Sequence, residues 1–248
     1  MSAEQAIRLQ RDGFVVLSQI YHHDELEVLI EQADRAIEYA RSTHQLGPVN
    51  LSDQLQPCWF EDAAQRRGFV QTLFSASLHE QVDSLLQEIY VHNLQLFYNP
   101  KDGREPYWHR DLQFSSLEDA EHRALLPELQ SHHLRIPLLS ERGLYVVPGS
   151  HRRWDDQTER RARKSAFGLI TLPNQQLIEL SAGDVLIFHS ELIHRGEYQA
   201  NTERLAYDVC VGQPHIELLK HYNAENRVEP SLASLSKWLE AAPNKLEP

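Results

Sequence analysis

The second half of the chain is a series of short apolar or alternating runs that are separated by turn residues. The runs are VHNLQLFYN, HHLRIPLL, GLYVV, QLIEL, DVLIF and LAYDVCV, and the breaks between them have sequences such as PKDG, PGS and AGD. Strands that follow one another at this spacing are typical of an antiparallel sandwich or jelly roll. A βαβ architecture would place helices between them. The pattern therefore predicts a mainly β core over residues 90–213.

Helices are expected on both sides of this core. Residues 1–89 form a predicted helical layer that contains one strand, FVVL, and residues 214–248 form a predicted helical tail. Residues 43–56 carry Gly, Pro, Asn and Ser without periodicity and are expected to form a loop. The predicted helices are at residues 2–11, at 23–41, at 63–89 with an interruption near 75–77, at 155–164 as an insert in the β core, and at 231–242.

The length and composition fit one domain that spans residues 1–248. An apolar content of 41% is sufficient for a core, and no break divides the chain. With 24 Lys plus Arg against 36 Asp plus Glu, the net charge of -12 disfavours nucleic acid and anionic membranes as partners. No apolar run is long enough to cross a bilayer. The two cysteines, Cys58 and Cys210, are too few for a disulfide framework, which favours the cytoplasm.

A metal site is indicated by PYWHRDLQF, in which a single residue separates His109 from Asp111. Strand side chains alternate, so residues i and i+2 point the same way and can bind one ion. Two imidazoles and one carboxylate on one face of an octahedron are the ligands that non-haem iron enzymes use, and they leave three positions open. An H-x-D pair alone is a weak signal. Arg110 between the two is expected to point to the opposite face and to be structural.

The third ligand is expected from AGDVLIFHSELIHRGEYQANTERLAYDV. His189 and His194 compete for this role. His189 shares a strand face with apolar residues, as a packed histidine does, and His194 lies just beyond the strand, so His194 is favoured. Arg204, ten residues after His194, heads the next strand, where its guanidinium is placed to hold the distal carboxylate of a 2-oxo acid.

Four motifs in this order resemble the phytanoyl-CoA dioxygenase-like family. They are DGFVVL, YWHRD, LYVVPGSHR and AGDVLIFHSELIHRG followed by an arginine, and the resemblance extends from about residue 12 to about residue 211. It implies a double-stranded β-helix core of the cupin-like type, Fe(II), 2-oxoglutarate as co-substrate and O2. By matching motif, it implies that His109, Asp111 and His194 bind iron and that Arg204 binds the distal carboxylate of 2-oxoglutarate. Asn93 stands at the place of a family glutamine that contacts 2-oxoglutarate, and Gln95, two residues on and on the same face, is an alternative; an ordinary polar strand residue is the other interpretation of both.

The chain departs from the family pattern at three places. Gly196 stands where the family commonly has serine, and Arg204 lies one residue nearer to His194 than usual. The asparagine-glycine linker before the PGSH turn is contracted to residues 140–143. The resemblance therefore implies less about contacts to 2-oxoglutarate around Gly196 than about the iron ligands.

The predicted function is oxidation, most simply hydroxylation, of an unactivated C–H bond of a small molecule, with 2-oxoglutarate and O2 converted to succinate and CO2. The alternative is a metal-binding cupin-type isomerase or small-molecule binding protein. Trp108 is a candidate for the wall of the substrate pocket or for the core. Arg135 is a candidate anchor for an anionic substrate group or a solvated arginine. His132 and His133 are expected at the surface or a strand edge. The substrate and the oligomeric state are not indicated.

Overall fold

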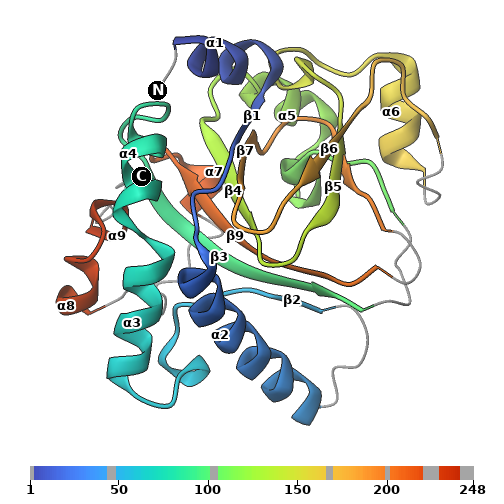
Figure 1. The fold of residues 1–248 in the computed structure, drawn as a ribbon. Helices are drawn as coiled ribbons and strands as arrows, with labels where there is room; N and C mark the ends of the chain where they lie inside the picture. The colour runs from blue at the N-terminus through green and yellow to red at the C-terminus, as the bar shows by residue number, and fades with distance from the viewer. Residues whose placement is uncertain are drawn as a thin grey trace.

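Two antiparallel β-sheets face each other at the centre of the fold, and helices pack on the outer face of the larger sheet (Figure 1). The computed structural model describes residues 3–43, 49–100, 106–165, 170–198, 202–219 and 229–240. The six-stranded sheet has the order β1-β7-β4-β9-β3-β2, and the three-stranded sheet has the order β6-β5-β8. The strands are β1 Phe14–Leu17, β2 Val49–Leu51, β3 Tyr90–Asn99, β4 Ser131–Pro137, β5 Glu141–Val146, β6 Gln176–Leu180, β7 Val185–His189, β8 His194–Gly196 and β9 Arg204–Gly212.

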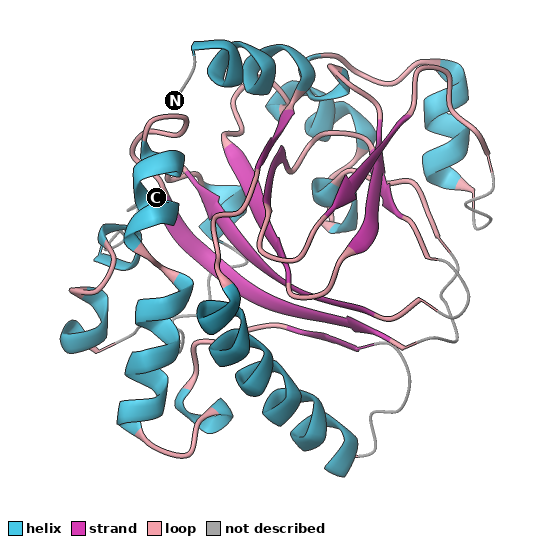
Figure 2. Ribbon diagram, in the orientation of Figure 1, coloured by secondary structure: helices cyan, strands magenta, loops and turns pink. Residues whose placement is uncertain are grey.

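The helices surround the sheets and do not alternate with the strands of the core as a βαβ fold requires (Figure 2). Every strand pair of the described residues is antiparallel, so the predicted mainly β fold with flanking helices is confirmed. No described helix is both long and apolar enough to span a lipid bilayer. The α-helices are α1 Ala3–Asp12, α2 His23–Ser42, α3 Ala63–Leu73, α4 Ala76–Asp83, α5 Asp119–Leu125, α6 Gln157–Lys164, α7 Ile216–Leu219, α8 Pro230–Ala233 and α9 Lys237–Glu240.

Alternation along the strands of the large sheet separates an apolar core from a polar interior between the sheets. Leu134 and Ile136 of β4 belong to the core that also includes apolar residues of α2, α3 and α4. His133 and Arg135 alternate with them and therefore point to the opposite face, toward the small sheet. On this second face, Leu186 and Phe188 of β7 pack against residues of β5 and β6. The fold thus directs polar side chains into the space between the sheets.

The prediction that His132 and His133 lie at the surface or a strand edge was wrong. Both residues are in β4, which pairs with β7 on one side and β9 on the other. The side chain of His133 is 13% exposed and His132 is 7% exposed. Two polar residues at the start of a strand are typical of an edge strand. The sequence of one strand does not show which strands lie beside it in the sheet.

Other differences concern the bounds of elements. The expected loop at residues 43–56 contains β2, which pairs with β3. The helical region predicted at 63–89 is two helices, because Ser75 caps α4, accepting a hydrogen bond from the Leu78 amide at 3.3 Å. The second helix ends at Asp83. The predicted terminal helix at 231–242 is two short helices, α8 and α9, and residues 241 and 242 lie outside the described residues. The helical insert begins at Gln157, capped by Asp156.

Candidate metal centre

Backbone hydrogen bonds bring the three predicted iron ligands together from two parts of the chain. His109 and His194 form an isolated antiparallel bridge, in which the His109 amide donates to the His194 carbonyl at 2.9 Å and the reverse bond is 3.0 Å. Asp111 begins the 3-10 helix Asp111–Phe114, and its amide donates to the Ser190 carbonyl at 3.1 Å. The loop after β3 is therefore attached to the β7–β8 segment at both ligand positions.

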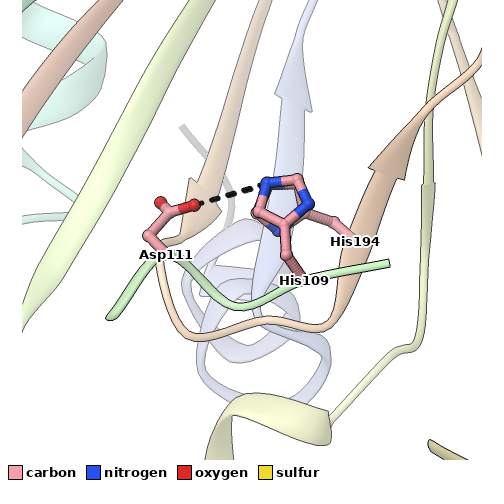
Figure 3. A group of neighbouring side chains, drawn as sticks. All are labelled: His109, Asp111 and His194. Carbon is pink, nitrogen blue, oxygen red and sulfur yellow. Dashed lines mark ion pairs between the residues drawn. The ribbon is translucent and has the colours of Figure 1, made fainter. Parts of the chain in front are cut away.

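The three side chains present suitable ligand atoms to one point (Figure 3). One nitrogen or oxygen from each of His109, Asp111 and His194 lies within 4.8 Å of the others, and Oδ1 of Asp111 is 3.6 Å and 3.7 Å from the two Nε2 atoms. Each Nδ1 faces a backbone carbonyl, at 3.2 Å for His109 and 2.8 Å for His194. A carbonyl only accepts, so Nδ1 carries the proton and Nε2 keeps its lone pair for a metal.

The electrostatics keep the imidazoles neutral and the carboxylate ionised. Burial, with the charge of His194, lowers the pKa of His109 to about 3, and burial also lowers the pKa of His194. Burial alone would raise the pKa of Asp111, but the charge of His133 and its hydrogen bond to the carboxylate outweigh burial and lower that pKa well below its usual range. His133 Nε2 is 2.7 Å from Asp111 Oδ2. These are the protonation states that a divalent cation requires of its ligands.

His194 and not His189 lies beside the other two side chains. His189 contacts the rings of His132 and His151, at centroid distances of 5.0 and 5.1 Å. Its Nε2 is 3.0 Å from the Leu129 carbonyl and its Nδ1 accepts from the Glu191 amide at 3.1 Å. Both ring nitrogens of His189 are therefore already hydrogen-bonded. The geometry favours His194 as the third ligand.

Arg110 points away from the ligand atoms and is completely buried. Its Nε and Nη2 donate to Asp155 Oδ1 at 2.9 and 2.8 Å. The guanidinium also donates to the carbonyls of Ser150 and Arg153, both at 3.0 Å, and to that of Glu191. All five of its N–H groups are used in this way. Arg110 thus fixes the segment between His109 and Asp111 to the turn that precedes α6.

A pocket of about 400 Å³ extends from the candidate metal centre between the sheets. Among the predicted co-substrate residues, Arg204, Asn93 and Gln95 all line it. Asn93 and Gln95 are on the same face of β3, and Asn93 Oδ1 accepts from the Asp53 amide at 3.2 Å. Arg204 is 4% exposed at the start of β9. The pocket therefore brings a buried guanidinium and two amide side chains into the same space as the three candidate ligands.

Of the alternatives for Trp108 and Arg135, the structure agrees with Trp108 as a core residue and disagrees with a solvated Arg135. Trp108 is absent from the described pocket lining, is 1% exposed, and packs in a separate apolar cluster with Val147 and Ile193. Its indole donates to the Ile170 carbonyl at 2.7 Å, so it belongs to the core. Arg135 does line the pocket, but its side chain is 5% exposed and ion-paired with Glu141 and Asp208.

Sequence reasoning missed three residues of this site, His133, Glu141 and Tyr198. His133 is two residues before Arg135 and so shares its strand face, but the sequence does not show that this face is turned toward Asp111. Glu141 pairs with arginines that are 6 and 63 residues away, and Tyr198 stacks on Arg204 at 4.6 Å. Nothing local in the sequence indicates these contacts, because they depend on how β5 and β9 approach each other.

Comparison with known families shows the family to which the chain belongs. The sequence profile described as Phytanoyl-CoA dioxygenase (PhyH) matches residues 9–204, a range that includes all three candidate ligands and ends on Arg204. The chain belongs to the phytanoyl-CoA dioxygenase family. Members of this family are non-haem, iron- and 2-oxoglutarate-dependent oxygenases. The metal and co-substrate expected from the sequence are therefore those of the family.

The individual relatives and solved structures that resemble this chain have low sequence identity to it. Ectoine dioxygenase of Sphingopyxis alaskensis is 28% identical over 223 residues, which are 78% of this chain and 70% of that protein. HygX from Streptomyces hygroscopicus, crystallised with iron and also with nickel and 2-oxoglutarate, has a TM-score of 0.65 with 17% identity in its iron form, covering 86% of this chain and 87% of its own. The epimerase SnoN from nogalamycin biosynthesis has a TM-score of 0.58 with 18% identity, over 92% and 86% of the two chains. These structures share the jelly-roll fold.

Proposed function

We propose that this protein is an Fe(II)- and 2-oxoglutarate-dependent dioxygenase that hydroxylates an unactivated C–H bond of a small molecule. The observation that carries the proposal is the convergence of His109, Asp111 and His194 within 4.8 Å beside a pocket that also contains Arg204. Two neutral imidazoles and one carboxylate are the donor set of non-haem iron oxygenases. His109, Asp111 and His194 would hold the iron, and Arg204 would hold the distal carboxylate of 2-oxoglutarate.

Bound iron, with 2-oxoglutarate and O2, supplies the oxidising power for C–H cleavage and yields succinate and CO2. The residues of the chain provide position and protonation state. Asp111 keeps its negative charge beside His133, and the backbone carbonyls at Nδ1 fix the orientation of both imidazoles. In related halogenases a small residue replaces the carboxylate to admit halide, so Asp111 supports hydroxylation or a related oxidation.

The substrate is proposed to be a small molecule, as it is for the named relatives. A pocket of about 400 Å³ suits such a ligand. Phe114, 61% exposed, and Tyr107 flank His109 and would form one wall of the substrate side. Because the epimerase SnoN shares the fold, the reaction is to be assigned from the product and not from succinate release alone.

The first test is an anaerobic titration of the Fe(II)-loaded protein with 2-oxoglutarate, followed by the visible metal-to-ligand absorption band. We expect the band in the wild type and in Asp24→Ala, an exposed control on α2. Asp111→Ala should not retain iron or form the band. Arg204→Ala should form it only at a much higher 2-oxoglutarate concentration. Absence of the band in the wild type would refute the proposed function.

The second test is a metabolite panel that includes ectoine, with succinate release as the screen and mass spectrometry of the product as the assignment. A mass increase of one oxygen atom, labelled from 18O2, would establish hydroxylation. Turnover without incorporation would indicate epimerisation, desaturation or ring closure. Unchanged turnover in Asp111→Ala would show that the chemistry takes place elsewhere.

A further inference from the structure

Glu141 is a buried carboxylate that binds two arginines at once. Its side chain is 0% exposed. Oε1 accepts from Arg135 Nε at 2.8 Å and Arg204 Nη2 at 3.1 Å, and Oε2 accepts from Arg204 Nε at 2.9 Å and Arg135 Nη2 at 3.1 Å. Both guanidinium groups are therefore held in the bidentate geometry that fixes their planes. Glu141 is absent from the described pocket lining, whereas both arginines line it. The carboxylate therefore binds the two guanidinium groups on the side that faces away from the pocket.

The two arginines differ in what remains free for a ligand. The Nη1 of Arg135 is 3.2 and 3.3 Å from the two carboxylate oxygens of Asp208, which itself lines the pocket. Nη2 of Arg204 also donates to the Gly143 carbonyl at 3.0 Å, but its Nη1 makes no hydrogen bond to another described residue. Arg135 is thus neutralised by two carboxylates, and of the two arginines only Arg204 has a guanidinium nitrogen, Nη1, without a hydrogen bond to another described residue.

Tyr198 lies against the guanidinium of Arg204. The Arg204 guanidinium is 4.6 Å from the centre of the Tyr198 ring, and Tyr198 also lines the pocket. The phenol fits because residue 196 is glycine. A Cβ atom on Gly196 would be 2.5 Å from the Tyr198 hydroxyl oxygen, which is closer than two such atoms can approach. The absence of a side chain at Gly196 therefore makes room for the Tyr198 hydroxyl at the arginine end of the pocket.

We infer that Tyr198 and Arg204 together bind the distal carboxylate of the 2-oxo acid co-substrate, and that Glu141 is the positioning residue that holds Arg204 for this task. The inference rests on the proposed function and deepens it. Arg204 Nη1 and the Tyr198 hydroxyl are the donors to the distal carboxylate. Arg135 is not a donor to it, because its Nη1 is paired with Asp208. Because Glu141 fixes the guanidinium, the separation between candidate metal and carboxylate donors is fixed, and the site selects the length of the dicarboxylate.

The test measures 2-oxoglutarate binding by the anaerobic titration described above, in the wild type, Glu141→Gln, Tyr198→Phe and Glu179→Gln. Glu179 is exposed on β6 and serves as the matched charge control. We expect the control to bind as the wild type does. Glu141→Gln should raise the dissociation constant by about tenfold or more, as loss of a supporting contact does at other sites. Tyr198→Phe, which keeps the ring, should raise it roughly three- to tenfold.

A second readout separates positioning from general damage. The same titrations with 2-oxoadipate, which is one methylene longer, give a selectivity ratio for each protein. We expect Glu141→Gln to lower the preference for 2-oxoglutarate, because Arg204 is then free to follow the longer acid. Tyr198→Phe should lower the preference because one of the two donors that fix the position of the distal carboxylate is lost. A merely destabilised pocket would weaken both acids equally and leave the ratio unchanged.

Three outcomes would overturn the inference. They are an unchanged dissociation constant in Glu141→Gln or Tyr198→Phe, an unchanged selectivity ratio, and tighter binding in Glu141→Gln, which would make Glu141 a competitor of the ligand. If thermal unfolding shows that Glu141→Gln is not folded, Glu141→Asp decides, because its shorter side chain cannot reach both guanidinium groups and the same rise is expected. A wild-type protein without the band refutes the proposed function, whereas a normal wild-type band with unaltered variants refutes only this inference.

Discussion

Replacement of Arg110 by methionine should strongly destabilise the protein, although Arg110 touches no candidate ligand atom. The change removes all five guanidinium hydrogen bonds and leaves the fully buried Asp155 with a single cationic partner, Arg163. Breaking a buried ion pair by removing one partner costs about 3–5 kcal/mol. For a chain of 248 residues this corresponds to a decrease in melting temperature of roughly 6–20 °C.

The assay is urea and thermal unfolding of the metal-free protein, so that altered metal binding does not contribute. Arg160→Met is the control, because Arg160 is 61% exposed and pairs with Asp119 at the surface. An exposed pair of this kind contributes less than about 1 kcal/mol. If Arg110→Met lost no more stability than Arg160→Met, the buried network would not be what holds the ligand-bearing segment in place.

Three further predictions concern buried histidines and one glycine. Burial, then the charges of His151 and His133, lowers the pKa of His132 from 6.5 to about 3, so its contribution to stability is complete above pH 6.5 and is lost as the pH falls toward 3. At pH 5 this amounts to about 2 kcal/mol, and the difference in unfolding free energy between pH 8 and pH 5 should shrink by that amount in His132→Asn. An equal difference in both proteins would contradict the assignment. His194→Ala should lower Fe(II) affinity about a hundredfold by calorimetry, whereas His189→Ala should lower stability and leave that affinity nearly intact; the reverse order would make His189 the ligand. Gly143→Ala should lower the melting temperature, because its φ is +64° and a Cβ would lie 2.2 Å from the Ile178 carbonyl oxygen, and an unchanged value would show that the β5–β6 bulge relaxes freely.

The sequence predicted those features that depend on local pattern. The antiparallel fold followed from short runs with turn residues between them. Strand alternation predicted that His109 and Asp111 lie close together, and the structure brings them together with His109 in an isolated bridge and Asp111 at the start of a 3-10 helix. The choice of His194 over His189 also depended on alternation, because Val185, Ile187 and His189 share one face of β7. Each of these inferences needs only the few residues around the motif.

Features that depend on which strands become neighbours could not be predicted. His133 was expected at the surface, yet β4 lies between β7 and β9, and its side chain reaches Asp111. Trp108 was a candidate pocket residue because it is next to His109 in the sequence. In the structure its indole instead donates to the Ile170 carbonyl. In the sequence, Glu141 is simply a charged residue in a contracted turn. Its contacts with two arginines are visible only in the structure, where β5 approaches β9.

The two backbone hydrogen bonds between His109 and His194 hold the candidate ligands together independently of a metal ion. Because peptide groups hold the two imidazoles side by side, we expect the segments that carry the ligands to fold without the ion. Zinc fingers are the opposite case, since they unfold without metal. We expect a chelator to remove iron while the far-ultraviolet circular dichroism spectrum stays unchanged, and re-addition of Fe(II) to restore 2-oxoglutarate binding without refolding. The metal would then be exchangeable in the folded protein and would not be a structural component of the fold.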